Sequence, residues 1–279
     1  MKKNHLDLEQ SELGKKTEYD SHYNPEKLFP IPRKDKRDEI GVPDLLPFFG
    51  FDLWNHYEVS WLNEKGKPVV AFAEISYGCE TPFIIESKSM KLYFNSLNNT
   101  KFKNTEVVQA TIKKDIEEKI GGKAAVKIIP LNKLNNRIFS GFEGDCLDEL
   151  DIECTSYTID TSFLKSDGDI IEETVYSHLL KSNCLVTHQP DWGSVQIAYT
   201  GKKINREGLL RYLVSFRNHN EFHEQCIERI FIDILTHCRP KELTVYGRYT
   251  RRGGLDINPY RSTKKNIFAS IQNRRLFRQ

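Results

Sequence analysis

Two stretches in the first half of the chain combine aromatic and β-branched residues with alternating or consecutive apolar positions. They are residues 52–62 and 67–77, and the four residues between them, Asn-Glu-Lys-Gly, have the composition of a turn. This pattern predicts a β-hairpin. From Thr105 onward, apolar residues recur with the period of an amphipathic helix that ends at Gly121, and residues 125–129 predict a further strand. The apolar positions of the helix are Val107, Val108, Ile112, Ile116 and Ile120.

A similar order of elements follows in the second half. Residues 186–199 and 209–216 predict strands, residues 221–237 predict a helix, and residues 243–249 predict a closing strand. The expected buried stripe of this helix consists of Cys226, Ile230, Ile234 and His237.

The two halves also match each other when one is shifted by 119 residues, which superposes the two predicted helices. The same order of elements at the same spacing favours a duplicated unit of two strands, a helix and two strands. The identical residues under this shift are Tyr93 with Tyr212, Ser96 with Ser215, and Asn99 with Asn218.

The length of the chain predicts two domains, because single domains cluster at roughly 100 to 150 residues and this chain has 279. Residues 1–42 are polar and contain three prolines, which predicts an extended arm lying over a neighbouring surface. Residues 43–150 are expected to form an N-terminal module and residues 151–279 a C-terminal module. The acidic segment 145–153 is expected to begin the connection between them.

Charge argues against nucleic-acid binding by electrostatics alone, because 41 Lys and Arg residues are balanced by 39 Asp and Glu residues for a net charge of +2. A local exception follows Tyr260, where basic residues occur with no acidic residue among them. We interpret this tail as a solvated helix end, and the alternative is a contact to a phosphate or a partner. Its basic residues are Arg261, Lys264, Lys265, Arg274, Arg275 and Arg278.

The six cysteines are scattered with no CxxC pair, which does not suggest a disulfide framework, and the first ten residues lack the apolar core of a signal peptide. The longest unbroken apolar run is Val69 to Ala73, far below the roughly 20 residues of a membrane span. We therefore expect a soluble protein of the reducing cytoplasm, with no contact to a membrane.

The segment from Asn183 to Ser194 carries the first candidate chemistry. Cys184 is a soft nucleophile, Asp191 is a carboxylate seven residues later, His188 lies between them, and Pro190 restrains the turn before the carboxylate. Such a set suits covalent catalysis. Taken alone, a cysteine beside a strand is more often a small core residue.

A second polar cluster surrounds the start of the second predicted helix. There, a buried Glu224 beside His223 could accept two parallel N–H bonds from a guanine-like base, while the simpler alternative is a solvated polar first turn. Metal binding is a rival use of the same region, because His219 and His223 have a helical ligand spacing and Cys184 and His188 add two further ligand types.

No Rossmann or P-loop motif occurs in the sequence. Two other segments could hold phosphate. Residues 87–91, Ser-Lys-Ser-Met-Lys, offer hydroxyl and ammonium groups, and residues 251–254, Arg-Arg-Gly-Gly, combine guanidinium charge with exposed backbone amides. Either segment could equally form a solvated turn.

Together, four segments resemble the signatures of 7-cyano-7-deazaguanine reductases, the NADPH-dependent nitrile reductases of the queuosine pathway, in their long two-module form. The resemblance extends through nearly the whole chain. One departure is Leu185, where the family usually has proline. The four segments are Cys184 to Trp192, Glu86 to Tyr93, Ser215 to Glu224, and Arg252 to Tyr260.

The resemblance implies an α+β tunnelling fold, in which tandem ββααββ modules form antiparallel sheets with helices on one face and barrels close by oligomerisation, here as a homodimer. It implies that Cys184 attacks the nitrile carbon to form a thioimide, that Asp191 donates the proton and that His223 assists. The residues that it implies for base binding are Ile85, Glu86, Ser87, His223 and Glu224, and those for NADPH are Ser87, Lys88, Arg252 and Gly253.

The same resemblance predicts two NADPH molecules per turnover, a small deazapurine substrate, no metal, and no direct contact with nucleic acid. Two alternatives remain from the residues alone. One is a zinc-dependent cyclohydrolase-type enzyme of the same fold that uses Cys184 and the histidines as ligands, and the other is a non-catalytic purine-binding or RNA-modification partner that depends on the basic tail.

Overall fold

The computed structural model describes residues 19–134, 139–265 and 273–279. The chain divides into two compact units, and each draws on separate stretches of sequence. The predicted modules 43–150 and 151–279 are each continuous, so the sequence pattern did not indicate this interleaving. Of the described residues, unit 1 contains 19–38, 53–134 and 251–256, and unit 2 contains 39–52, 139–250, 257–265 and 273–279.

The sheet of unit 1 is built on the predicted hairpin, β2 (Phe49–Leu62) and β3 (Pro68–Gly78), with β5 (Ala124–Pro130) on the other side of β3. Asn63 closes the hairpin, because its N–H donates to the Lys67 carbonyl at 2.9 Å and its side chain accepts from the Lys67 N–H at 2.9 Å. Strands β3 and β5 are antiparallel. The predictions of the hairpin and of the strand at 125–129 are confirmed.

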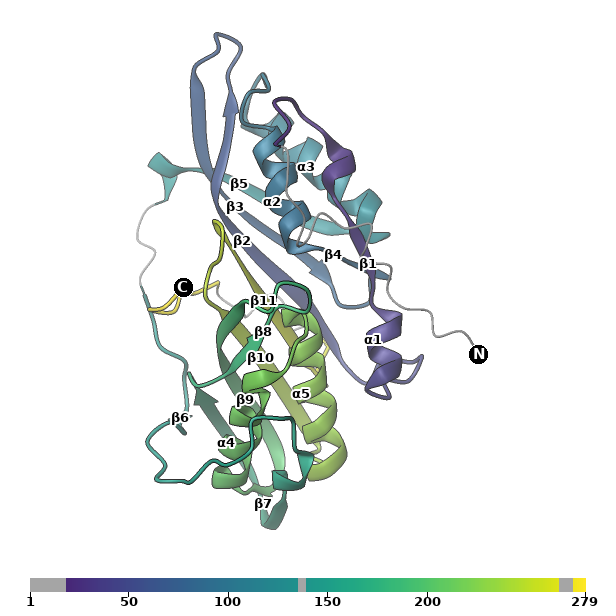
Figure 1. Cartoon of the computed structure of the whole chain (residues 1–279), viewed down its shortest axis with the longest axis vertical. Helices are drawn as coiled ribbons and strands as arrows, with labels where there is room; N and C mark the ends of the chain where they lie inside the picture. Colours follow the sequence, from purple (N-terminus) through teal and green to yellow (C-terminus); the bar gives the residue numbers. More distant parts are fainter. Residues whose placement is uncertain (1–18, 135–138, 266–272) are drawn as a thin grey trace. The chain divides into compact units, whose positions relative to one another are not determined.

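Two helices, α2 (Ser87–Ser96) and α3 (Thr105–Ile120), pack on one face of this sheet (Figure 1). The predicted helix from Thr105 is confirmed, with the Asn104 side chain as its N-cap and Gly121 in the left-handed region at φ 67°. Four of its five predicted apolar positions are buried, but Val107 is 41% exposed. Val107 lies in the first turn of the helix.

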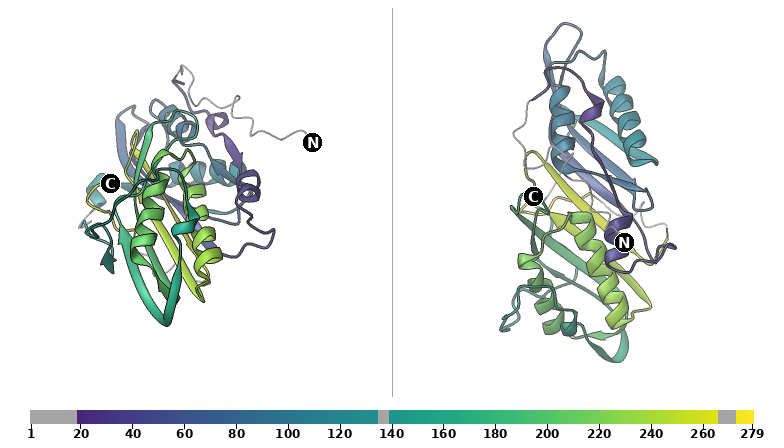
Figure 2. Two further views of the ribbon diagram at one scale, coloured as in Figure 1. Left: turned by 60° about the horizontal axis from the view of Figure 1, so that its bottom comes forward. Right: turned by 45° about the vertical axis from the view of Figure 1, so that its right-hand side comes forward.

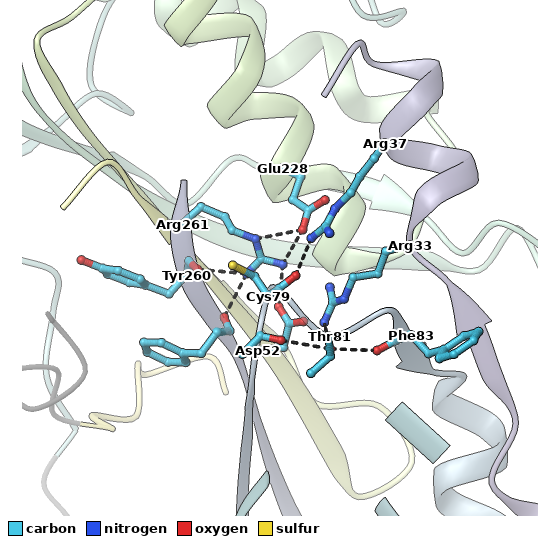
Figure 3. A network of polar contacts seen from close by, with 11 residues as sticks. Arg33, Arg37, Asp52, Cys79, Thr81, Phe83, Glu228, Tyr260 and Arg261 are labelled. Carbon is cyan, nitrogen blue, oxygen red and sulfur yellow. Dashed lines mark hydrogen bonds and ion pairs between the residues drawn. The ribbon is translucent and has the colours of Figure 1, made fainter. Parts of the chain in front are cut away.

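Residues 19–38 of the predicted arm belong to unit 1. Its short strand β1 (Pro30–Pro32) pairs with β4 (Phe83–Ile85), and the Tyr23 hydroxyl donates to Asp115 on α3 at 2.8 Å. The helix α1 (Lys34–Glu39) follows, and Arg37 donates to the Cys79 carbonyl at 2.7 Å (Figure 3). The short 3-10 helices along the chain are η2 (Pro25–Lys27), η3 (Leu131–Lys133), η4 (Thr161–Phe163) and η5 (Phe216–Asn218).

The sheet of unit 2 has the strand order β11-β10-β9-β7-β6, with β8 also paired to β9. Its pairs are antiparallel except for the parallel pair of β6 and β7. The molecule is thus α+β, with mainly antiparallel sheets and few helices. The strands are β6 (Asp145–Cys146), β7 (Ser166–Ser177), β8 (Lys181–Asn183), β9 (Pro190–Ile204), β10 (Glu242–Tyr249) and β11 (Leu255–Ser262).

Helices α4 (Arg206–Ser215) and α5 (His223–Cys238) lie on one face of the unit 2 sheet (Figure 2). The prediction of a strand at 209–216 is wrong, because the Asn205 side chain caps a helix there and Leu209, Leu210 and Leu213 are buried. The helix over 221–237 is confirmed as α5, except that His237 is exposed rather than part of the buried stripe. No helix in the described ranges is long and apolar enough to cross a membrane.

Tyr93 and Tyr212, which match each other at a shift of 119 residues, make the same kind of contact between two helices of their units. The Tyr93 hydroxyl on α2 donates to Asp115 on α3 at 2.6 Å, and the Tyr212 hydroxyl on α4 donates to Asp233 on α5 at 2.6 Å. In each unit a tyrosine therefore fixes the first helix of the pair to the second. The repeated unit contains two helices rather than the one expected from the hydrophobic pattern.

The basic tail after Tyr260 is not a solvated helix end in its described part, and this interpretation is wrong. Arg261 lies in β11 and is fully buried, where it donates to Glu228 at 2.8 Å and forms an ion pair with Asp52 at 2.9 Å (Figure 3). Lys264 and Arg274 pair with acidic residues from distant parts of the sequence. Residues 266–272 of the tail lie outside the described residues.

Candidate functional site

Cys184 lies directly after β8 in a tight loop that leads back into β9. Its N–H donates to the Gln189 carbonyl at 2.8 Å, and its carbonyl accepts from the His188 N–H at 3.1 Å. His188 adopts the left-handed conformation at φ 55°, which lets the chain reverse within these few residues. The β8–β9 pairing thus continues up to the cysteine.

The register of β8 and β9 brings Cys184 and Asp191 to the same face of the strand pair. Ser182 is directly opposite Asp191, and Cys184 is two residues beyond Ser182. Diagonal neighbours of this kind have Cβ atoms roughly 7 Å apart or closer. Both residues are buried: Cys184 is 4% exposed and Asp191 is 6% exposed. The predicted nucleophile and the predicted proton donor are therefore neighbours.

His223, the first residue of α5, joins this pair. Its Nε2 atom lies 3.4 Å from Oδ1 of Asp191. Its ring stacks face to face on Tyr249 at the end of β10, with ring centroids 3.8 Å apart and an interplanar angle of 2°. Among the described residues, the buried Nδ1 atom of His223 has no hydrogen-bond partner. Asp191 and the stacked tyrosine thus hold the imidazole, and one of its nitrogens remains available to a ligand.

Glu221, two residues before α5, has a buried carboxylate, and its backbone connects the start of the helix to the cysteine loop. Glu221 accepts from Arg229 at 3.0 and 3.1 Å and pairs with His219 at 2.9 Å. Burial opposes ionisation of Glu221, but the hydrogen bonds from His219 and Arg229 outweigh it and hold its pKa below the usual range. The Glu221 N–H donates to the Asn183 carbonyl at 3.1 Å, which fixes the helix start beside Cys184.

Glu224 lies in the first turn of α5 and is 2% exposed. The expectation of a solvated polar turn is therefore wrong for this residue. A carboxylate in this position can accept hydrogen bonds from a planar ligand that reaches the helix start.

A second thiol, Cys226, lies close to the same cluster but differs in environment. It is fully buried, and this burial holds the pKa of its thiol well above the usual range, with the Glu221 carboxylate adding to the effect. A thiol of this kind is a poor nucleophile at neutral pH. Cys184 is therefore the better candidate of the two.

Within residues 19–134, 139–265 and 273–279, no group of three or more His, Cys, Asp or Glu side chains is placed to hold a metal ion. The three histidines of the zinc alternative make other contacts instead, His223 with Asp191 as described above. His219 pairs with Glu221, and Nδ1 of His188 lies 3.2 Å from Oδ1 of Asn220. The structure therefore does not gather Cys184 and the histidines into a zinc site.

The predicted base- and cofactor-binding residues of the first half lie in unit 1, at the end of β4 and the start of α2. Glu86 is the N-cap of α2, and its carboxylate accepts from the backbone N–H groups of Lys88 and Ser89 at 2.7 Å each. Burial raises the pKa of Glu86, although these two hydrogen bonds act in the opposite direction. Because Glu86 already occupies these amides, any phosphate at this helix start must be held by the side chains of Ser87 and Lys88.

The segment Arg251–Gly254 lies in the same unit and approaches α2. Gly253 has φ 60°, and a Cβ atom on it would be 2.9 Å from Cε of Lys91. The Gly254 carbonyl accepts from the Tyr57 N–H at 2.8 Å and bonds Nδ1 of His56 at 2.9 Å. Burial lowers the pKa of His56 to about 4, so the ring is neutral and donates through Nδ1. Both predicted cofactor segments therefore lie next to Lys91.

Sequence reasoning missed Tyr249, Arg229 and His56. Tyr249 was included only in a predicted strand, and a strand pattern does not show which ring a tyrosine stacks on. Arg229 is eight residues from Glu221, which places it two helical turns away and could have suggested the pairing.

The comparisons with known proteins agree over both halves of the chain. Residues 19–128 match the family model described as nitrile reductase, 7-cyano-7-deazaguanine-reductase N-term, and residues 190–267 match the model described as QueF-like protein. The chain is 64% identical over 272 residues to the NADPH-dependent 7-cyano-7-deazaguanine reductase of Legionella pneumophila (strain Lens), covering 97% of this chain and 95% of the relative.

A further relative with the same description, from Azoarcus sp. (strain BH72), is 54% identical over 259 residues and covers 92% of each chain. A solved structure of the archaeosine synthase QueF-Like in the apo form aligns with 36% of this chain and 99% of its own chain, at 14% identity and a TM-score of 0.31.

Proposed function

Since the chain belongs to the family of NADPH-dependent 7-cyano-7-deazaguanine reductases, we propose that it reduces the nitrile of 7-cyano-7-deazaguanine to the aminomethyl group, as part of queuosine tRNA modification. The observation that carries the proposal is the placement of Cys184 and Asp191 as neighbours across β8 and β9, with His223 against Asp191. A thiol, a carboxyl group and an imidazole in this arrangement suit covalent attack on a nitrile.

The first step forms a bond between the Cys184 sulfur and the nitrile carbon while one π bond of the nitrile breaks. The nitrile nitrogen takes up a proton from Asp191, and the product is a thioimide on the enzyme. Conversion of a nitrile to an amine needs four electrons, so two hydride transfers follow. The first hydride and a proton convert the thioimide into a group still bonded to sulfur, which protects it from hydrolysis. Its carbon–sulfur bond then breaks, which returns the Cys184 thiolate and leaves an imine. The second hydride and a second proton convert the imine to the amine.

Asp191 must be protonated when the nitrile nitrogen gains charge, while Cys184 must be ionised to attack. A single proton shared by the two groups satisfies both conditions. The thiol proton moves to Asp191 as the sulfur attacks, and Asp191 passes a proton to the nitrogen, so the step consumes no external proton. The contact of 3.4 Å between His223 and Asp191 orients the carboxyl group for this transfer.

For base recognition we propose Glu224, His223, Ile85, Glu86 and Ser87. Glu224 accepts two N–H bonds from the guanine-like edge, which suits its burial at the start of α5. Nδ1 of His223 provides a further contact to the substrate. Glu86 has a carboxylate but uses it in the N-cap of α2, so its contact with the base requires a remaining lone pair.

Unit 1 contains groups that fit NADPH phosphates. Ser87, Lys88 and Arg252 provide a hydroxyl and two cationic groups. The missing Cβ of Gly253 lets the Lys91 side chain approach the backbone closely, which adds a third cationic group. We propose that these residues bind the cofactor, which supplies the hydrides of both reduction steps. The deazapurine and NADPH account for both small-molecule partners, and the mechanism requires no metal.

We also propose that the sheets close into a barrel through a homodimer in the cytoplasm. Strand β5 ends the strand order at one side, and pairing with a second subunit would cover such an edge. All six cysteines are free, which suits a reducing compartment where Cys184 stays available. Because the substrate is a free base, direct contact with nucleic acid is not required.

Incubation of the purified protein with 7-cyano-7-deazaguanine and NADPH tests the proposal. We expect NADPH oxidation that depends on the substrate, two equivalents for each amine formed, and none with Cys184→Ala. Absence of oxidation by the folded, unmodified protein would refute the assignment. Stoichiometric zinc in active protein would instead favour the cyclohydrolase-type alternative.

A further inference from the structure

Gln279, the last residue of the sequence, is buried in unit 2, and its side-chain amide makes four hydrogen bonds. The amide oxygen accepts from Nε of Arg248 at 2.8 Å and from the Leu276 N–H at 3.1 Å. The amide nitrogen donates to the Tyr249 carbonyl at 3.0 Å and to Oδ1 of Asn258 at 2.8 Å. Every donor and acceptor position of the amide is therefore used, which only a glutamine side chain of this length can achieve here.

This amide lies where the ladder between β10 and β11 stops. The pairing of the two strands extends as far as Tyr246 opposite Tyr260. The preceding residue of β11 is Pro259, which has no N–H to continue the ladder. Beyond this point, Oδ1 of Asn258 accepts from the Tyr249 N–H at 3.3 Å, and Gln279 donates to the Tyr249 carbonyl. Two side chains thus replace the missing backbone pairing at the end of β10.

The residue held in this way is the one that supports the catalytic histidine. Tyr249 stacks on His223, whose Nε2 faces Asp191. The tyrosine ring fits a slot between two glycines, because a Cβ on Gly193 would be 3.1 Å from one ring edge and a Cβ on Gly247 would be 3.3 Å from the other. The ring has little freedom of its own, so its position follows that of the β10 backbone.

The neighbouring Arg278 holds the adjacent strand at the same level. Its Nη2 atom donates to the Gly193 carbonyl at 2.9 Å and to the His178 carbonyl at 2.7 Å. Gly193 is the register partner of Tyr249 and lies two residues after Asp191 in β9. The last two residues of the sequence therefore contact the two strands that carry Asp191 and Tyr249.

We propose that Gln279 is a positioning residue of the active site, whose amide sets the place of Tyr249 and thereby holds His223 against Asp191. This inference rests on the proposed function, since it assigns Gln279 an effect on proton delivery to the nitrile nitrogen. Gln279 does not contact the substrate in this scheme. Its loss should slow formation of the Cys184 adduct without changing the binding of NADPH.

Two substitutions test the proposal. Gln279→Met keeps the approximate side-chain volume and removes all four hydrogen bonds. Gln279→Glu keeps the acceptor for Arg248, but it places a carboxylate oxygen next to the Tyr249 carbonyl, where the amide nitrogen donated. We expect both variants to form the adduct about 10- to 100-fold more slowly, because small misplacements of reacting groups cost rates of this order. Adduct formation is followed by intact mass with 7-cyano-7-deazaguanine and no NADPH, and the KM for NADPH is measured separately and should not change.

Asn205→Ala is the matched control, because it removes the N-cap hydrogen bond to Gly208 at 2.7 Å and destabilises unit 2 far from the site. Asn205 follows the last residue of β9 and is fourteen residues beyond Asp191, roughly 45 Å for an extended strand. A purely structural role predicts equal adduct rates for the folded fractions of the Asn205 and Gln279 variants, and that result would overturn the proposal.

Unfolding of both Gln279 variants at the assay temperature, seen by circular dichroism, would also overturn it, because the amide would then serve overall stability. Failure of the unmodified protein to form an adduct would refute the proposed function instead. The two failures are therefore distinguishable.

Discussion

Replacement of Asp191 by asparagine separates proton delivery from the shape of the site. The side chain is buried and lies 3.4 Å from Nε2 of His223, so asparagine keeps the volume and can still accept a hydrogen bond from the imidazole. It has no acidic proton to give to the nitrile nitrogen. General acid catalysis contributes about 100- to 10,000-fold to rates, which corresponds to roughly 3 to 5 kcal/mol of activation free energy. We expect thioimide formation by Asp191→Asn to slow by a factor in this range.

The assay mixes enzyme with excess 7-cyano-7-deazaguanine in the absence of NADPH, quenches with acid at successive times, and measures the fraction of adduct by intact mass. Asp233→Asn is the matched control. Asp233 accepts from the Tyr212 hydroxyl at 2.6 Å and has its pKa raised by burial, but it lies ten residues along α5 from His223, roughly 15 Å away. This control replaces a partly buried carboxyl group in the same unit and should leave the rate of adduct formation unchanged.

An Asp191→Asn variant that forms the adduct as fast as the unmodified enzyme would refute the assignment of Asp191 as the proton donor. Equal slowing by Asp191→Asn and Asp233→Asn would refute it as well, because loss of a carboxylate anywhere in unit 2 would then explain the effect. Thermal unfolding of both variants shows whether they are folded at the assay temperature.

Further variants test the other assignments. Cys184→Ala should abolish the adduct whereas Cys226→Ala should retain it, and peptide mapping of an adduct to Cys226 would contradict the choice of nucleophile. Glu224→Gln should weaken substrate binding by about 1 to 3 kcal/mol in a calorimetric titration. The carboxylate offers an acceptor to each of the two N–H donors of the base, whereas the amide places its own NH2 against one of them. Arg252→Ala should raise the KM for NADPH and leave NADPH-free adduct formation intact; the reverse pattern would assign Arg252 to the base or the fold. Arg261→Met removes a cation that pairs with the buried carboxylates of Asp52 and Glu228, so it should destabilise the protein by about 3 to 5 kcal/mol in chemical denaturation, and an unchanged midpoint would contradict this.

Local sequence patterns determined several of the secondary-structure elements. The hairpin of β2 and β3 follows from alternating side chains around a turn, and α3 follows from an Asn cap, a 3.6-residue period and a terminal Gly121. These signals act between residues close in sequence, so they can be read without the rest of the molecule. The order of Cys184 and Asp191 suited covalent catalysis, and the family resemblance assigned their proposed roles. The β8–β9 register then placed them close together.

Only the tertiary structure decided features that depend on distant residues. The segment 209–216 has apolar residues that suit either a strand or a helix. In the structure it forms α4, whose Leu209 and Leu213 are buried and whose N-cap is Asn205. Arg261 appeared as part of a basic tail because its partners, Glu228 and Asp52, are far away in sequence.

The stacking of Tyr249 on His223 and the hydrogen bond from Gln279 to the Tyr249 carbonyl could not be predicted from the sequence either. Both depend on strand register and on the place where Pro259 ends a ladder. The sequence by itself therefore determined the local elements and indicated the candidate reactive groups. The tertiary structure decided which distant groups contact them, because long-range pairing is set by the packing of the whole unit rather than by any local pattern.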